Sequence, residues 1–380
     1  MRGSIRQRSK GTWQLRYEAP TDLQGNRGQI SETVRGTRKE AERALRDRLS
    51  QIENGGFVTK SKETVEGFLD RWLESYAAIH TEPSTLQGYR AHTRLYVNPH
   101  LGTVQLQALR PAHIHSLHAH LLDRGLSPKT IRLTHAMFRE ALKHAVEWGE
   151  LMNNPAVAAK PPPLERREVK AWDTATFNTF LIAADQSPFR DAYHLIILTG
   201  LRRSELCGLM WNEVDLDAGE LAVRRKLLRV TGRGLVEGKP KTQRGRRKIA
   251  LGDEATTVLR RVRGQQAERR LQTGSAWQGR GHVFTDEMGN PIDPERITRS
   301  FRRLVQEHDL PHLTPHGLRH TWVSILSAAG VPIDVISKQA GHASVAFTLD
   351  IYSHMIDSVE RKAADAVDEA MRRSRVASDR

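Results

Sequence analysis

The sequence predicts a multidomain, mainly α-helical protein with a small β-β-β-α module at its N-terminus. Strand-like alternation near the N-terminus gives way to amphipathic helical spacing, and one strand-rich segment interrupts the helical second half. With 380 residues, the chain can form two or three domains that each bury a core. The expected parts are a β-rich module (1–56), a helical bundle (60–160), a linker (161–172), an α-rich domain with a β-hairpin or small sheet (173–355), and a C-terminal helix and tail (356–380).

The composition favours a polyanionic partner. The chain has 59 Lys and Arg residues against 44 Asp and Glu residues, a formal charge of +15, and nucleic acid is the first candidate for such a charge. Charge alone leaves open a basic protein of the ribosome or of a membrane surface. Because Cys207 is the one cysteine, an intramolecular disulfide and a cysteine-rich zinc site are excluded. No apolar run suits a membrane span and the N-terminus lacks signal-peptide character, so we expect a cytoplasmic protein without a membrane partner.

Residues 1–56 have the pattern of a small sheet followed by one helix. Residues 12–17 and 29–34 alternate as strands do, and turn-forming residues separate them. Thr37 and Glu40 are spaced as a capping box and predict a helix that ends near Asn54. Basic residues gather near one end of the expected three-stranded sheet: Arg2, Arg6, Arg8, Lys10 and Arg16. Such strands can lie in a DNA groove; the alternative is a small domain with a solvated basic edge.

Residues 60–160 have the spacing of about four amphipathic helices. Apolar residues that recur at three and four positions share one helix face. The faces are marked by Val65, Phe68, Leu69, Trp72, Leu73 and Tyr76; by Tyr89 and Leu95; by Ile114, Leu117, Leu121 and Leu122; and by Ile131, Phe138, Leu142 and Ala145. Ser84 is the expected cap of the second helix. Ser127 and Pro128 open the fourth, and Gly149 ends it.

Prolines separate this bundle from the second half of the chain. Pro155 and the consecutive prolines of 161–163 cannot continue a helix and favour an extended spacer. We therefore place the main domain boundary there. From Asp173 onward the pattern is mostly helical, with strands expected within about 221–251.

The segment 224–248 is strongly basic. Apolar residues flank it and a glycine-rich turn divides it, so a basic hairpin is expected. It has one acidic residue, Glu237, and eleven basic residues: Arg224, Arg225, Lys226, Arg229, Arg233, Lys239, Lys241, Arg244, Arg246, Arg247 and Lys248. A run of charges is usually a solvated face, but this excess suits a phosphate backbone, with an affinity that falls steeply as salt rises.

Two candidate residues follow an apolar run that ends at Gly200. Arg202 and Glu205 are three residues apart, so on a helix the carboxylate would orient the guanidinium. An ordinary surface ion pair is the alternative interpretation.

A second candidate region contains a histidine series. His308, His312, His316 and His320 recur every four residues. Prolines at 311 and 315 interrupt that helix and no carboxylate completes a zinc site, so we expect no metal site. The pattern favours a helix that begins near Thr314, with His316 and Arg319 one turn apart.

The last candidates lie near the C-terminus. Residues 330–338 predict a turn and a helix opened by Pro332, and Gly341 is its expected C-terminal cap, which places His342 at the edge of a pocket. Tyr352 is the only tyrosine after Arg202. A lone histidine or tyrosine is most often structural. Together with two arginines, these groups suit attack on a phosphodiester and stabilisation of the resulting charge.

The ordered set of candidates resembles the tyrosine recombinases, also called the phage integrase family. The set is Arg202, Lys241, His316, Arg319, His342 and Tyr352. Its local motifs are Gly-Leu-Arg-Arg-Ser-Glu-Leu (200–206), Pro-Lys-Thr (240–242), His-Gly-Leu-Arg-His-Thr (316–321) and Gly-His-Ala-Ser (341–344), and no catalytic position departs from the family pattern. The order of the upstream parts resembles integrases of the lambda and conjugative-transposon type.

The resemblance implies an enzyme that cuts and rejoins DNA through a 3′-phosphotyrosyl intermediate and so integrates or excises a phage or other mobile element. Tyr352 would be the nucleophile, Arg202 and Arg319 would bind the non-bridging oxygens, and His316 would assist proton transfer. His342 would hydrogen-bond the scissile phosphate. Lys241, preferred over Lys239 because it precedes Thr242, would protonate the leaving 5′-oxygen. No metal or other cofactor is expected, because the covalent intermediate keeps the bond energy.

The resemblance also implies partners. Double-stranded DNA attachment sites are the substrate, and two strand exchanges require four active sites, hence a homotetramer on DNA. Residues 1–56 would bind arm sites, and residues 60–160 would bind core sites. A terminal helix marked by Val359, Ala363, Val367 and Met371 would dock on a neighbouring protomer or on its own domain. An excisionase or a DNA-bending host factor is a further partner of such enzymes, and the bacterial cytosol or nucleoid is the expected location.

Four alternatives stay open at this point. A chromosome-dimer-resolving recombinase or a type IB topoisomerase would use the same groups, although the extra N-terminal module argues against the topoisomerase. A non-catalytic DNA-binding regulator would tolerate loss of the tyrosine. A metal-dependent nuclease would lose activity on addition of EDTA.

Overall fold

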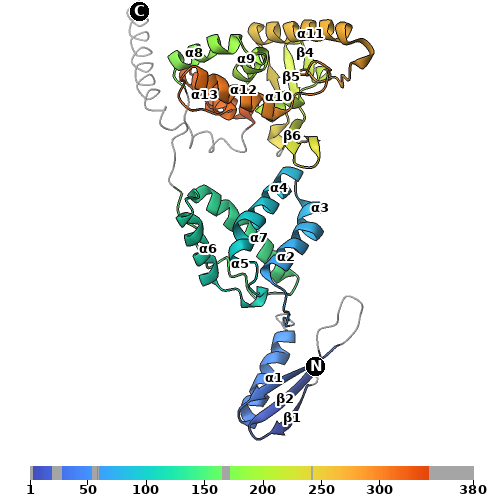
Figure 1. The fold of residues 1–380 in the computed structure, drawn as a ribbon, viewed down its shortest axis with the longest axis vertical. Helices are drawn as coiled ribbons and strands as arrows, with labels where there is room; N and C mark the ends of the chain where they lie inside the picture. The colour runs from blue at the N-terminus through green and yellow to red at the C-terminus, as the bar shows by residue number, and fades with distance from the viewer. Residues whose placement is uncertain are drawn as a thin grey trace, which may run out of the picture. The chain divides into compact units, whose positions relative to one another are not determined.

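The computed structural model describes residues 3–18, 28–53, 58, 60–164, 172–240 and 243–341. The chain divides into two compact units, Met1–Glu165 and Arg166–Arg380 (Figure 1). Helices predominate, and small sheets lie in the N-terminal module and in the second unit. The predicted fold class is therefore confirmed. Most of the expected linker, residues 165–171, lies outside the described residues.

The N-terminal module is a three-stranded antiparallel sheet packed against one helix. β1 (Gly3–Ser9), β2 (Thr12–Glu18) and β3 (Gln29–Arg35) pair in that order, and α1 (Arg38–Glu53) follows. Leu15 and Tyr17 of β2 pack with Leu45 of α1 in the core. The predicted capping box is confirmed: the Thr37 N–H donates to Glu40 at 2.7 Å, and the Glu40 N–H donates to Thr37 at 3.4 Å.

The sequence pattern does not locate β1, because this strand has no buried residue. Its side chains are exposed apart from the half-buried Ile5, which pairs with Leu15 of β2. Since side chains alternate across a strand, Arg6 and Arg16 lie on the opposite face from Ile5 and Leu15. Arg8 donates to Gln14 on this same face at 2.9 Å. The sheet thus carries exposed arginines on the face that α1 leaves open; Arg2 lies outside the described residues.

Residues 60–164 form a helical bundle in which short elements join into continuous helices. α2 (Val65–Trp72) runs through a π-helical turn into α3 (Ala78–His80), and α4 (Pro83–His92) runs in the same way into α5 (Asn98–Leu101). α6 (Pro111–Asp123) and α7 (Pro128–Glu147) complete the bundle. Phe68, Trp72, Ile114 and Phe138 are fully or almost fully buried in its core.

Two details of this bundle differ from expectation. Ser84 is not the cap of α4, because Pro83 already occupies the first helical position and Glu82 precedes it. The fixed φ of proline suits that position, so the helix begins earlier. Leu95 and Leu122, both expected on apolar helix faces, are 45% and 43% exposed, whereas Leu121 is fully buried. Adjacent residues on a helix do not share a face, so Leu121 and Leu122 cannot both face the core. The cap at Ser127 is confirmed by its hydrogen bond from the Thr130 N–H at 3.3 Å.

The second unit is mostly helical. Its helices are α8 (Thr174–Asp185), α9 (Arg190–Thr199), α10 (Arg203–Gly208), α11 (Asp253–Thr273), α12 (Pro294–Glu307), α13 (Pro315–Ala328) and α14 (Ile333–Ala340). The core contains Phe180, Tyr193 and Phe301. Trp172, which falls in the expected linker, is buried in this core, and its ring stacks on Phe301.

The strand-rich interruption consists of two small sheets. β4 (Val214–Asp215), β5 (Glu220–Val223) and β8 (Arg247–Ala250) form one antiparallel sheet, in which Leu221 lies opposite Ile249. β6 (Lys226–Val230) and β7 (Gly234–Gly238) form a separate hairpin. The prediction of a hairpin in the basic segment is therefore confirmed, although the strands begin earlier, at Val214. Across the described ranges of both units, no helix is long and apolar enough to cross a membrane.

Candidate active site

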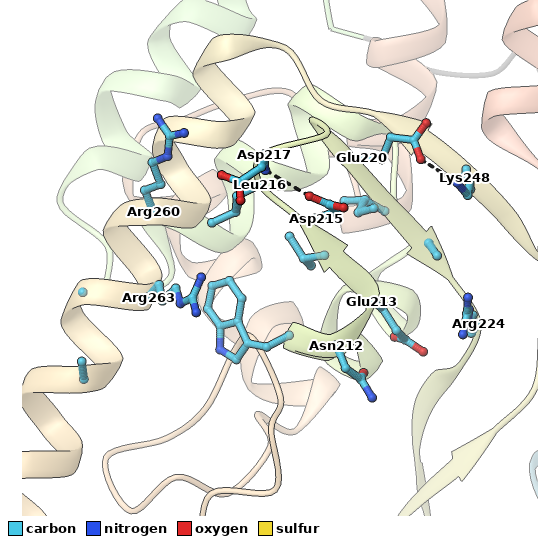
Figure 2. Close-up of a pocket in the computed structure, with 16 residues that line it drawn as sticks. Asn212, Glu213, Asp215, Leu216, Asp217, Glu220, Arg224, Lys248, Arg260 and Arg263 are labelled. Carbon is cyan, nitrogen blue, oxygen red and sulfur yellow. Dashed lines mark hydrogen bonds and ion pairs between the residues drawn. The ribbon is translucent and has the colours of Figure 1, made fainter.

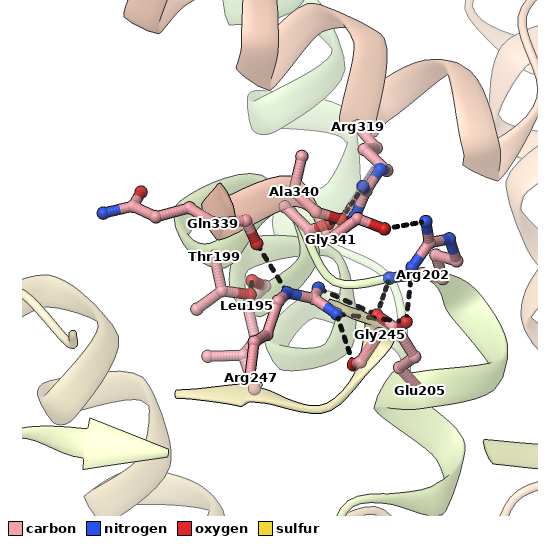
Figure 3. Close-up of polar contacts among 11 residues, drawn as sticks. Leu195, Thr199, Arg202, Glu205, Gly245, Arg247, Arg319, Gln339, Ala340 and Gly341 are labelled. Carbon is pink, nitrogen blue, oxygen red and sulfur yellow. Dashed lines mark hydrogen bonds and ion pairs between the residues drawn. The ribbon is translucent and has the colours of Figure 1, made fainter. Parts of the chain in front are cut away.

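Three arginines converge on the C-terminal end of α14 (Figure 3). Each donates to a different, consecutive backbone carbonyl: Arg247 Nε to Gln339 at 2.5 Å, Arg319 Nη2 to Ala340, and Arg202 Nη2 to Gly341 at 3.0 Å. The last carbonyls of a helix have no partner within the helix and carry the negative end of its dipole. The three guanidinium groups therefore satisfy and stabilise this helix end.

Arg202 lies at the N-terminus of α10, where Glu205 holds it. The Arg202 N–H donates to Glu205 Oε2 at 3.0 Å, and Arg202 Nη1 donates to Oε1 at 2.6 Å. The predicted pairing is confirmed, but its geometry differs: Arg202 is extended and precedes the helix instead of sharing a helical face with Glu205. A surface ion pair is the wrong interpretation, because Glu205 is only 4% exposed.

Glu205 is a buried carboxylate between two cations. Arg247 Nη2 donates to its Oε2 at 2.9 Å, and Arg247 Nη1 donates to its Oε1 at 3.2 Å. Burial favours a higher pKa for Glu205, but the charges and hydrogen bonds of Arg247 and Arg202 outweigh it and leave the pKa lowered. Glu205 is therefore anionic at neutral pH.

Arg319 lies on α13 and is 1% exposed. Its Nη1 donates to the Gly200 carbonyl at 2.6 Å. Gly200 ends α9 with a φ of 63°, and a Cβ there would lie 2.6 Å from the Trp322 ring, so only glycine lets this loop approach α13. The fold itself thus orients the Arg319 guanidinium before any DNA is bound.

His316 lies in the first turn of α13, one turn before Arg319, as predicted. Desolvation, together with the charges of His320, Arg319 and Arg202, lowers the pKa of His316 to about 4. At neutral pH the imidazole is uncharged and can accept a proton.

The described residues bring together three of the six candidates: Arg202, His316 and Arg319. The other three, Lys241, His342 and Tyr352, lie outside the described residues. The expected helix cap directly before His342 is confirmed, because Gly341 ends α14 with a φ of 62°.

Arg247 is a residue of this site that the sequence analysis missed. It appears in the sequence as one of eleven basic residues, yet its side chain is 5% exposed. The alternation of side chains in a strand could have indicated its burial. Residues two apart in a strand face the same side, and Ile249, two residues after Arg247, is apolar and buried.

Acidic residues from other elements neutralise part of the basic segment. Arg225 pairs with Glu213 at 3.0 Å, Arg229 with Asp293 at 2.9 Å, and Lys248 with Glu220 at 2.7 Å. Exposed basic residues of the segment include Arg224, Arg233, Lys239 and Arg246. We therefore expect phosphate contacts from these exposed residues and not from the whole basic segment.

The histidine series does not lie on one helix. His308 follows the last residue of α12, and His312 lies in the loop before α13, whereas His316 and His320 lie on α13. Within the part of the chain that the structure describes, no group of three or more His, Cys, Asp or Glu side chains could hold a metal ion.

A pocket of about 770 Å³ lies elsewhere in this unit, between the β4–β5 region and α11 (Figure 2). Trp211 lines it, with Arg263 against the indole ring at 5.8 Å. Both acidic and basic side chains line it, and Glu220 pairs there with Lys248. Arg202, His316 and Arg319, the candidates within the described residues, do not line this pocket, so it is separate from the arginine cluster.

Comparison with protein families agrees with the geometry. Residues 174–358 match the phage integrase family, and residues 64–122 match the N-terminal SAM-like domain of phage integrases. The chain belongs to the phage integrase family. It is therefore a tyrosine recombinase, an enzyme that transfers DNA strands, and the predicted family is confirmed.

This integrase-family chain is similar to one named recombinase in sequence and to two solved integrases in structure. It is 27% identical over 351 residues to a tyrosine recombinase XerC-like protein of Caldanaerobacter subterraneus subsp. tengcongensis, covering 88% of this chain and 90% of the relative. The Tn1549 transposon integrase, solved with a circular intermediate DNA, matches with a TM-score of 0.66 and 24% identity, covering 80% of this chain and 99% of that one. A lambda integrase tetramer bound to a Holliday junction matches with a TM-score of 0.56 and 19% identity, covering 90% and 95%. Both structures share the fold of this chain.

Proposed function

We propose that this recombinase integrates and excises a mobile DNA element, with Tyr352 as the nucleophile. One observation carries the proposal: Arg202, directly before α10, and Arg319 of α13 converge on residues 340–341, which directly precede His342. The two guanidinium groups that suit a phosphate therefore lie beside residues 340–341, after which the chain continues to Tyr352.

In the cleavage step, the Tyr352 hydroxyl oxygen attacks the scissile phosphorus. A bond forms from that oxygen to the 3′-phosphate, and the bond to the 5′-oxygen breaks. His316, uncharged at neutral pH, takes the phenolic proton, and Lys241 gives a proton to the departing 5′-oxygen. Arg202, Arg319 and His342 stabilise the charge on the non-bridging oxygens.

In the joining step, the 5′-hydroxyl of a partner strand attacks the phosphotyrosyl bond and releases Tyr352. The new phosphodiester replaces the old one, so bond energy is conserved and no step calls for a cofactor. Two such exchanges between duplexes use four active sites. The proposed assembly is therefore a homotetramer on DNA, and the lambda integrase tetramer of the same fold supports it.

The parts of the chain have separate proposed roles. Residues 1–56 bind arm sites through the open face of the sheet, where Arg6, Arg8 and Arg16 are exposed. Residues 60–160 bind core sites, 161–172 link them to the catalytic domain of 173–355, and 356–380 contact another protomer. We propose the bacterial cytosol as the location, since the XerC-like relative comes from a bacterium.

A nicked suicide substrate tests the function. The nick lets a short fragment diffuse away after cleavage and so traps the covalent adduct. We expect a protein–DNA adduct that survives denaturation, forms equally in EDTA, and depends on a specific attachment sequence. Cleavage that stops in EDTA, or that gives free ends without adduct, would instead indicate a metal-dependent nuclease.

A further inference from the structure

Arg247 occupies a central position in the arginine cluster, yet the proposed mechanism gives it no role. It makes a two-pronged contact with Glu205 and also donates from Nε to the Gln339 carbonyl. It therefore joins three elements: β8, α10 and the C-terminal end of α14 (Figure 3). Both partners of the ion pair are buried, at 5% and 4% exposure of their side chains.

We propose that Arg247 is a positioning residue for DNA cleavage, acting through Glu205 on Arg202 and through Gln339 on the segment that leads to His342. This inference rests on the proposed function. The side chain of Arg247 donates to Glu205, Gln339 and the Gly245 carbonyl, and the proposal gives it no contact with the phosphate.

The first half of the proposal concerns charge. One buried carboxylate faces two guanidinium groups, and its two oxygens are shared between them. Without Arg247, Glu205 would keep Arg202 as its one cationic partner among the described residues. Its pKa would rise, and its protonation would release the contact that orients Arg202.

The second half of the proposal concerns the packing of the residues before β8 against the end of α14. β8 begins at Arg247, six residues after Lys241, and Lys241 belongs to the connection from β7 that ends directly before Arg247. A Cβ on Gly341 would lie 3.1 Å from Arg247 Nη1 and 3.1 Å from the Arg244 carbonyl, so this connection packs directly against the end of α14. Arg247 thereby holds the residues directly before β8 against Gly341, and the proposed general acid Lys241 and His342 adjoin these two places in the sequence.

The test uses the full chain and single-turnover cleavage of the suicide substrate, with DNA binding measured separately. Because a small misplacement of reacting groups can cost about a hundredfold in rate, Arg247→Met should slow adduct formation by about that factor and leave binding nearly unchanged. Arg247→Lys keeps the charge but not the two-pronged geometry, and should lose about tenfold. Arg303→Met is the matched control, since it removes an exposed ion pair with Glu307 in the same unit.

Two further readouts separate positioning from general stability. Cleavage by Arg247→Met should become slower at acidic pH, because this variant has a Glu205 whose pKa is raised. The wild-type protein and the double variant Arg247→Met/Glu205→Gln should not show this pH dependence. The double variant should be no slower than the slower single variant, since both act through one contact. A purely structural role predicts additive losses of rate and no new pH dependence, and that result would overturn the inference.

Failure of the inference and failure of the proposed function are distinguishable. If the wild-type protein forms no adduct, the proposed function fails. If the wild-type protein forms the adduct and both Arg247 variants form it at the same rate, only the positioning role is contradicted. Arg247→Lys keeps this test decisive even if Arg247→Met does not fold.

Discussion

Arg202 donates a hydrogen bond from Nη2 to the carbonyl oxygen of Gly341 at 3.0 Å, although the two residues are 139 positions apart. The contact joins the N-terminus of α10 to the C-terminus of α14. Arg202 therefore has two roles in our account: it binds the scissile phosphate, and it holds the residue directly before His342.

A lysine at position 202 should not replace the arginine. Lysine retains the charge, but it is a single point donor and cannot contact Glu205, Gly341 and a phosphate with a planar fork. Arg202→Lys should reduce the cleavage rate by about 10² to 10³, as does loss of one donor to a developing oxyanion, while DNA binding persists. Single-turnover kinetics and a binding assay measure the two effects. Arg303→Lys, on the exposed face of α12, should cleave normally, and a normal rate for Arg202→Lys would contradict its role.

Two glycines with similar backbone angles provide a matched comparison. Gly341 has a φ of 62° and Gly330 a φ of 78°, so alanine at either position costs about 1 kcal/mol of backbone strain. A Cβ at Gly330 meets open space, whereas one at Gly341 would lie 3.1 Å from the Arg244 carbonyl. Gly341→Ala should therefore lower the free energy of unfolding more than Gly330→Ala, and it alone should slow cleavage. Urea denaturation and adduct formation measure both, and equal behaviour of the two variants would argue against close packing at α14.

The sequence predicts most local features of the fold because these depend on nearby residues. The capping box at Thr37, the helix start at Ser127 and the cap at Gly341 are each set by one or two side chains and the backbone beside them. The family motifs likewise identify Arg202, His316 and Arg319, which the fold brings into one electrostatic environment.

Features that depend on distant partners are not evident from the sequence. β1 has no apolar alternation and exists through its pairing with β2. Arg247 is hidden in a basic run, because only the fold reveals that Glu205 and Gln339 meet it. The geometry at Arg202 also differs from expectation, since Glu205 reaches back to a residue outside the helix.

The stability of the protein should depend on a buried histidine of the helical bundle. Burial, followed by the charges of His118, Arg139, Arg132 and His115, lowers the pKa of His135 to about 4, below the value of about 6.5 expected for an unfolded chain. Between these values the unfolded chain binds a proton that the folded chain does not. The free energy of unfolding should therefore fall as the pH decreases from about 6.5 to 4.

Replacing this histidine tests the contribution directly. His135→Leu should reduce the difference in unfolding free energy between pH 7.5 and pH 4.5, as measured by urea denaturation. Part of the difference should remain, because burial and the charge of Arg319 also lower the pKa of His320 to about 4. An unchanged difference in the variant would contradict the burial of a neutral His135.

The open face of the N-terminal sheet should bind separate DNA sites. Replacing Arg6, Arg8 and Arg16 with alanine should weaken arm-site binding. The slope of the logarithm of the binding constant against the logarithm of the salt concentration should become less steep by about 0.9 for each phosphate that the variant no longer neutralises. A charge-matched control replaces Lys39, Arg43 and Arg46, which are exposed on α1. Deletion of residues 1–56 should spare cleavage at the core site and impair integration. Equal recombination by the truncated protein would remove this role.

The central claim is that Tyr352 is the nucleophile, and mapping the covalent adduct tests it most directly. Trypsin should release a peptide of residues 339–361, bounded by Lys338 and Arg361, that contains Tyr352 as its only tyrosine. Mass spectrometry of the suicide-substrate adduct should find the nucleotide on this residue, and Tyr352→Phe should bind DNA without forming any adduct. An adduct on another residue, or one that persists in Tyr352→Phe, would contradict the account.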